Sequence, residues 1–184
     1  MALNEEIWHV TMGAMPLPLT GEESWNSFLT RRKELITRMD LAVCDGCDGC
    51  GGRCIDGFEV TRQEWEAVKS YLKTQPLSEV QRVREQKKTQ PWPGAEEFEA
   101  TVTYCPFRDL EQEKCSVYPA RPTICRLFGH TQWLPCPIGA VERVPEDAPE
   151  VWRQYRDLER KTWASWEEED TAKANEGRQN AVLL

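Results

Sequence analysis

Residues 44–54 read CDGCDGCGGRC, and this stretch decides how the rest of the chain must be organised. Its four cysteines follow the spacing C-x2-C-x2-C-x3-C, with glycine at most of the positions between them. Glycine allows backbone amides to turn toward sulfur without a Cβ clash. The chain has eight cysteines, and the remaining four are widely spaced: Cys105, Cys115, Cys125 and Cys136. Because thiolate sulfur is a strong ligand for zinc and iron, the pattern indicates metal binding.

Composition narrows the class of protein. A chain of 184 residues is long enough for one domain with a hydrophobic core. Its net charge of −8 argues against nucleic-acid or anionic-membrane partners. No stretch approaches the roughly 20 apolar residues of a membrane span, and the N-terminus lacks the features of a signal peptide. We therefore predict a cytoplasmic protein, where clustered cysteines more often bind metal than form disulfides, although an even number of cysteines also allows disulfides.

Apolar periodicity predicts several helices. Hydrophobic residues recur at helical spacing over residues 22–39. Thr61 and Glu64 have the form of a capping box, which predicts a helix that begins at about residue 62. A charged helix is expected at about 79–89, a proline-started helix over 119–129, and the longest helix over about 149–173.

One hairpin completes the predicted fold. Residues 101–104 and 115–118 are rich in β-prone side chains and are expected to pair across a ten-residue loop. The predicted class is therefore mainly α, a small α+β domain of four or five helices plus a short β-hairpin, stapled by cysteine metal sites. We expect an N-terminal extended segment over 1–20, a single metal-binding domain over 21–172, and a disordered tail over 173–184.

All eight cysteines are candidate metal ligands. The 44–54 spacing matches a ferredoxin run, but Ile55 stands where that run has proline, and the downstream cysteines do not repeat it. Eight thiols suit two four-thiolate sites, or one cluster and one zinc. One division places Cys44, Cys47, Cys50 and one downstream cysteine on the first metal and the remaining four on the second. His130 could substitute as a ligand, but a surface or helix-capping role is more common; His9 is a weaker candidate.

These residues carry a resemblance to a known family. The motif of Cys44, Cys47 and Cys50 is followed by CPF at 105–107, CSVY at 115–118 and RPxxCRxF at 121–128. Together they resemble the YkgJ-type cysteine cluster family, which is named for a CxxCxxCC motif and to which zinc or iron chelation is ascribed. The likeness covers 44–136. Gly51 replaces the second cysteine of the family's final pair, and the next thiol is Cys54. The resemblance implies metal chelation in a cytoplasmic protein and supplies no agreed reaction.

Three functions are compatible with the sequence. The first is a metal-binding module that holds zinc or iron, including a [4Fe–4S] cluster, without a defined reaction and with a protein partner as an open option. The second is an iron–sulfur electron-transfer or redox-sensing protein. The third is an iron–sulfur-dependent modifying enzyme such as a methyltransferase. The chain has no glycine-rich phosphate loop, H-E-x-x-H motif or nucleophile elbow to favour the third.

Overall fold

The computed structural model describes residues 21–44 and 47–182. The predicted extended segment over 1–20, with His9, lies outside these residues. The predicted fold class is confirmed, since helices dominate and the strands form short antiparallel pairs. The helices of the described residues are α1 (Gly21–Thr37), α2 (Arg62–Leu72), α3 (Leu77–Glu85), α4 (Thr123–Leu127), α5 (Ala148–Arg156) and α6 (Trp163–Val182).

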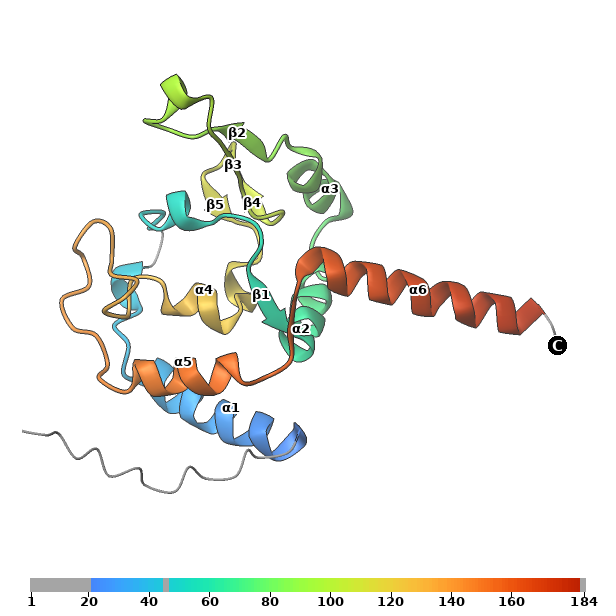
Figure 1. Cartoon of the computed structure of the whole chain (residues 1–184), viewed down its shortest axis with the longest axis horizontal. Coiled ribbons are helices and arrows are strands. Elements are labelled where there is room, and N and C mark those ends of the chain that lie inside the picture. Colours follow the sequence, from blue (N-terminus) through green and yellow to red (C-terminus); the bar gives the residue numbers. More distant parts are fainter. Residues whose placement is uncertain (1–20, 45–46, 183–184) are drawn as a thin grey trace, which may run out of the picture.

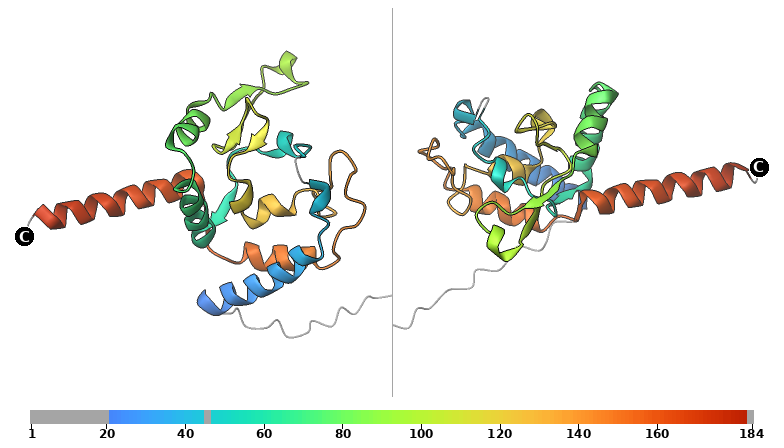
Figure 2. Two further views of the ribbon diagram at one scale, coloured as in Figure 1. Left: turned by 180° about the vertical axis from the view of Figure 1, so that it is seen from behind. Right: turned by 90° about the horizontal axis from the view of Figure 1, so that it is seen from above.

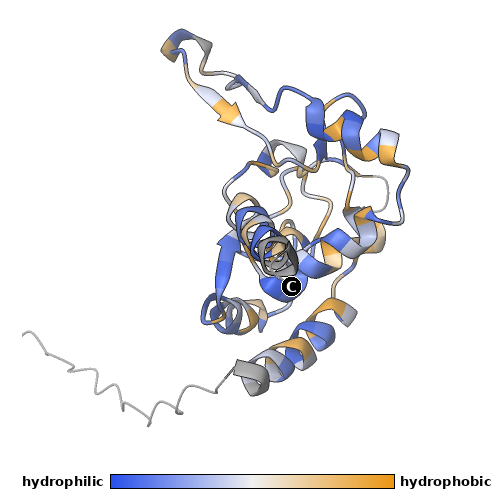
Figure 3. Ribbon diagram, turned by 90° about the vertical axis from the view of Figure 1, so that its right-hand side faces the viewer, coloured by the Kyte–Doolittle hydropathy of each residue, from blue (hydrophilic) through white to orange (hydrophobic). Residues whose placement is uncertain are grey.

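Three two-stranded sheets connect these helices (Figure 1). The first joins segments about 100 residues apart in sequence, so it closes the domain. The second is a hairpin that projects from the body of the molecule, and Figure 3 shows it in side view. The pairs are β1 (Glu59–Thr61) with β6 (Arg160–Thr162), β2 (Thr89–Pro91) with β3 (Thr101–Thr103), and β4 (Arg108–Asp109) with β5 (Lys114–Cys115).

One hydrophobic core lies where α1, α4 and α5 meet. Helices α1 and α5 lie side by side, and residues of α4 join the same core (Figure 1). Phe28 and Leu35 come from α1, and Tyr155 from α5; all three are buried, and the rings of Phe28 and Tyr155 are 5.5 Å apart. Leu127 and Ile124 bring α4 into the same cluster. The packing of this core therefore fixes the position of α4, the helix that carries Cys125.

A second core lies between α2, β1 and the first turn of α6. Trp65 and Val68 of α2 pack against Trp163 and Trp166, and Phe107 completes the cluster. The rings of Phe107 and Trp163 meet edge to face at 5.1 Å. Beyond this core, α6 extends away from the body of the molecule in every view (Figures 1 and 2).

The structure corrects three predicted elements. The helix expected over 119–129 is divided, because a 3-10 turn over Tyr118–Ala120 ends before Pro122 and α4 begins at Thr123. The expected pairing of 101–104 with 115–118 is wrong: residues 101–103 pair with 89–91, and 114–115 pair with 108–109. The expected helix over 149–173 is interrupted, because residues 160–162 form β6. Tyr155 belongs to the first core and Trp163 to the second, and the interruption lets each ring reach its own core. The division into 21–172 and a disordered 173–184 remains a prediction.

In the described residues, no helix is both long enough and apolar enough to cross a membrane.

Candidate metal centre

All eight cysteines carry free thiols, and these fall into two groups of neighbours. The first contains Cys136 and three thiols of the glycine-rich loop. Burial raises the pKa of the Cys50 thiol, and the charge of Cys136 raises it further. Burial also raises the pKa of Cys44, with Cys47 and Cys136 adding to the effect and Arg121 opposing it. We call Cys44, Cys47, Cys50 and Cys136 the first thiol group.

The second group gathers thiols from four separate segments. The Cys105 thiol donates a hydrogen bond to the Cys54 sulfur, which lowers the pKa of Cys54 and raises that of Cys105. Burial and the charge of Cys54 raise the pKa of Cys115 to about 11. Burial, then the charges of Cys115 and Cys54, raise the pKa of Cys125. We call Cys54, Cys105, Cys115 and Cys125 the second thiol group.

A recurring local turn aims backbone amides at the sulfurs. The amide of Gly49 donates to Cys47 Sγ at 3.3 Å, across two residues. At three other cysteines the amide of the second residue after the cysteine donates to the sulfur in the same way and acts to lower the thiol pKa. These amides are Phe107 for Cys105, Val117 for Cys115 and Ile138 for Cys136. An amide that points at sulfur favours the thiolate, which is the form that binds metal. Half of the cysteines therefore sit in turns suited to thiolate ligands.

The second thiol group and two thiols of the first, Cys47 and Cys50, line a common cavity of about 560 Å³. Its wall includes six thiols: Cys47, Cys50, Cys54, Cys105, Cys115 and Cys125. The wall also includes the apolar rings of Phe58, Phe107 and Phe128 and the side chains of Arg108 and Arg121. The cavity thus combines many sulfur donors with cations that offset the negative charge of thiolates.

Arg121 is the cation that acts on both groups. Its charge lowers the pKa of Cys44 in the first group and of Cys115 and Cys125 in the second. Its guanidinium carbon lies 3.6 Å from the centre of the Tyr118 ring, which holds it in place. Since four thiolates on one divalent ion leave a net charge of −2, a fixed cation here stabilises both groups electrostatically.

A second cation, Arg108, forms an ion pair with the glycine-rich loop. Arg108 pairs through both terminal nitrogens with the carboxylate of Asp48 and is 7% exposed. A Cβ at Gly51 would lie 2.9 Å from the guanidinium carbon of Arg108. A side chain at this position, which carries cysteine in the motif CxxCxxCC, would therefore have to displace the Arg108–Asp48 pair, and the next thiol of this loop is Cys54.

Glu64 positions the helix that carries Cys125. The predicted capping box is confirmed: the Glu64 amide donates to Thr61 Oγ1 at 3.3 Å, and the Thr61 amide donates to Glu64 Oε2 at 3.2 Å. The other carboxylate oxygen accepts the Thr123 amide at 2.7 Å, at the first residue of α4. The hydroxyl of Tyr155 donates to Oε2 at 2.6 Å. One buried carboxylate thus caps both α2 and α4.

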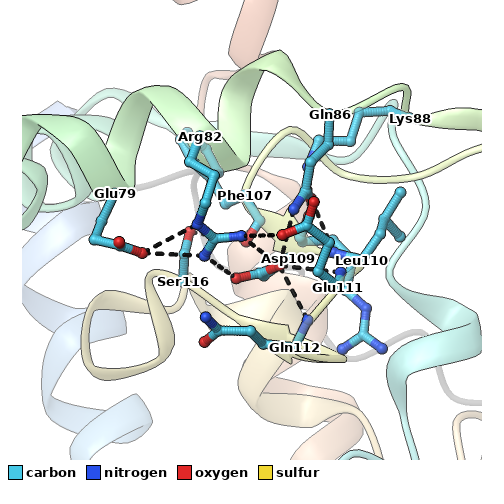
Figure 4. Close-up of polar contacts among 11 residues, drawn as sticks. Glu79, Arg82, Gln86, Lys88, Phe107, Asp109, Leu110, Glu111, Gln112 and Ser116 are labelled. Atoms are coloured by element: carbon cyan, nitrogen blue, oxygen red, sulfur yellow. Dashed lines mark hydrogen bonds and ion pairs between the residues drawn. The ribbon is translucent and has the colours of Figure 1, made fainter.

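Asp109 fixes the hairpin between Cys105 and Cys115. Its carboxylate is fully buried and accepts hydrogen bonds from Arg82 at 2.6 Å and from Gln86 at 3.0 Å (Figure 4). The amides of Glu111 and Gln112 donate to the same carboxylate at 3.1 Å, which closes the turn of the hairpin. The Arg82 side chain holds the pKa of Asp109 well below its usual range. The sequence offered no pattern that would have identified this network.

The thiol side chains do not converge on one point. Within the residues that the structure describes, no three His, Cys, Asp or Glu side chains lie close enough to hold a metal ion. The thiols of each group therefore lie near one another on fixed backbone segments, but their sulfur atoms do not point to a common centre. The donor set nevertheless fits a metal, because it offers sulfur in groups of four with amides and cations around it. Binding would require the thiols to rotate toward a common centre.

Clustered thiols on amide-rich turns are typical of cysteine-rich metal-binding domains. Residues 44–156 match the family named CxxCxxCC, whose description reads "Putative zinc- or iron-chelating domain". The chain belongs to this family. The match begins at Cys44 and ends with α5, so it includes all eight cysteines. No solved structure matches the chain.

Proposed function

We propose that this protein is a metal-binding module in which the first and second thiol groups each hold one zinc or iron centre. The observation that carries the proposal is the grouping itself: the eight thiols divide into two sets of four according to which thiols shift one another's pKa. Family membership supports zinc or iron as the metal. In this proposal all eight cysteines are candidate ligands.

The residues around the thiols have defined tasks in this proposal. Backbone amides and Arg121 oppose the rise in thiol pKa that burial causes, and so help metal to displace the thiol protons. Glu64 and Asp109 hold the segments that carry Cys125 and Cys115. A bound zinc ion would supply four strong bonds to sulfur and no redox chemistry, whereas an iron centre would also supply electron transfer.

The cavity favours one alternative. A space of about 560 Å³ that six of the eight thiols line is larger than a single zinc ion requires. A polynuclear iron–sulfur centre would use this volume, and the protein would then be an electron-transfer or redox-sensing protein, or an enzyme built on such a cluster.

Elemental analysis of anaerobically purified protein tests the proposal and separates these alternatives. We expect two equivalents of zinc or iron per chain, with full protection of the ligand thiols from alkylation. A colourless zinc protein would support the module, and visible charge-transfer absorption with acid-labile sulfide would support the cluster. A protein that takes up neither metal, with all eight thiols reactive, would refute metal binding.

A further inference from the structure

His130 lies against the first thiol group. It is 1% exposed, and its Nε2 is 3.3 Å from Cys44 Sγ. Its Nδ1 is also buried and has no hydrogen-bond partner among the described residues. The side chain does not cap α4, because it is the backbone amide of His130 that bonds to the carbonyl of Leu127, at 3.0 Å. A buried imidazole with one nitrogen on sulfur points to a role toward the metal.

The backbone conformation around Gly129 places His130 close to Cys136. Gly129 adopts φ +85°, a left-handed conformation, and its amide donates to the carbonyl of Leu134 at 2.9 Å. His130 then forms a bridge with Pro135, directly before Cys136. A Cβ at Gly129 would lie 3.8 Å from both Cys50 Sγ and the Cβ of Cys136, an ordinary contact distance, so both cysteines lie beside this turn.

The first thiol group and His130 therefore offer five donors, one more than a tetrahedral site needs. Cys47 is exposed, whereas Cys44, Cys50 and Cys136 are half-buried and His130 is buried. Structural zinc sites have four protein ligands and no open coordination position, and Cys3His is one of their common ligand sets. With Zn–S of about 2.3 Å and Zn–N of about 2.0 Å, a tetrahedron places nitrogen and sulfur about 3.5 Å apart. The observed 3.3 Å between His130 and Cys44 is close to this edge.

We propose that His130 binds metal through Nε2, in a Cys3His site with Cys44, Cys50 and Cys136, and that Cys47 is the thiol left at the surface. The inference rests on the proposed function and deepens it, because it assigns the first site a mixed ligand set and the second site four thiolates. It predicts seven metal–sulfur bonds in the fully loaded protein.

The test uses the full chain loaded with zinc, and two matched variants. His130→Asn keeps a polar side chain of similar size but should lose one of two zinc equivalents, or hold it at least tenfold more weakly against a chelator. Cys47→Ser should keep both. In wild-type protein, maleimide should label one thiol, and peptide mapping should locate it at Cys47.

Cobalt substitution gives an independent measurement that needs no variant. Thiolate-to-cobalt charge transfer in the wild-type protein should correspond to seven bonds to sulfur. The inference is overturned if Cys47→Ser loses a zinc while His130→Asn keeps both, if Cys47 is protected from maleimide, or if cobalt reports eight sulfurs. A wild-type protein that binds no metal would instead refute the proposed function.

Discussion

Replacing Glu64 by alanine should lower the free energy of unfolding by about 4 kcal/mol, since two buried amides and one buried hydroxyl lose their acceptor. The donors are the amides of Thr61 and Thr123 and the hydroxyl of Tyr155, at 3.2, 2.7 and 2.6 Å. An unsatisfied buried donor costs about 1–3 kcal/mol, so the three together exceed the effect of most single substitutions. Glu64→Gln keeps one acceptor oxygen and should cost about half as much.

Urea unfolding of the metal-loaded protein measures this effect, and Glu66→Ala is the matched control. Glu66 lies on the same helix, but its side chain is 46% exposed and pairs with Arg62 and Lys69 at the surface. Its removal should cost no more than about 1 kcal/mol. The Glu64 variant should also hold the metal of the second thiol group more weakly, because α4 carries Cys125. Equal losses in the Glu64 and Glu66 variants would refute the capping argument.

Three further predictions follow from the packing around the thiols. Gly51→Ala should destabilise the protein by about 1–3 kcal/mol, since the new methyl group meets Arg108. Gly52→Ala is the control and should be neutral, because a Cβ there meets nothing within 4 Å. Thermal unfolding compares the two variants, and equal melting temperatures would contradict this prediction. Asp109→Asn should cost about 3 kcal/mol at pH 7. The folded-state pKa of Asp109 is lowered, so its contribution to stability is complete above the unfolded pKa of about 4 and is lost as pH falls through the folded value. The difference in unfolding free energy between wild type and the Asn variant, measured in urea, should therefore shrink below about pH 4. A difference that stays constant with pH would exclude this ionisation. Removal of metal by a chelator should lower the melting temperature and raise the reactivity of the thiols, and an unchanged melting temperature would show that the metal is not structural.

Local signals in the sequence were sufficient for several elements. The capping box at Thr61 and Glu64 predicted the first residue of α2, because its two hydrogen bonds join residues three apart. Periodic apolar residues predicted α1 to within two residues at each end. The first thiol group was anticipated as three loop cysteines and one from further along the chain, although which one could not be predicted.

Contacts between distant segments could not be read from the sequence. The second bond of Glu64, to Thr123, joins residues 59 positions apart and has no local pattern. The ion pair of Arg108 with Asp48 also joins residues far apart in the sequence and has no local pattern. The strand pairings failed for a related reason: residues 101–103 have strong β propensity, but propensity does not choose a partner. The candidate metal ligands were chosen by residue type, and their division into two thiol groups required the fold.

The position of the second thiol group explains why metal and fold should depend on each other. Cys125 packs against the first core, whereas Cys105 and Cys115 pack against the second. A metal bound to these thiols would connect two cores that are each small, and it would connect them at their common boundary. Its four ligands come from four segments, so the complete site can form only after both cores have docked. Binding energy at such a site is therefore also folding energy, and loss of any one of these thiols should weaken the contact between the cores as well as the metal affinity.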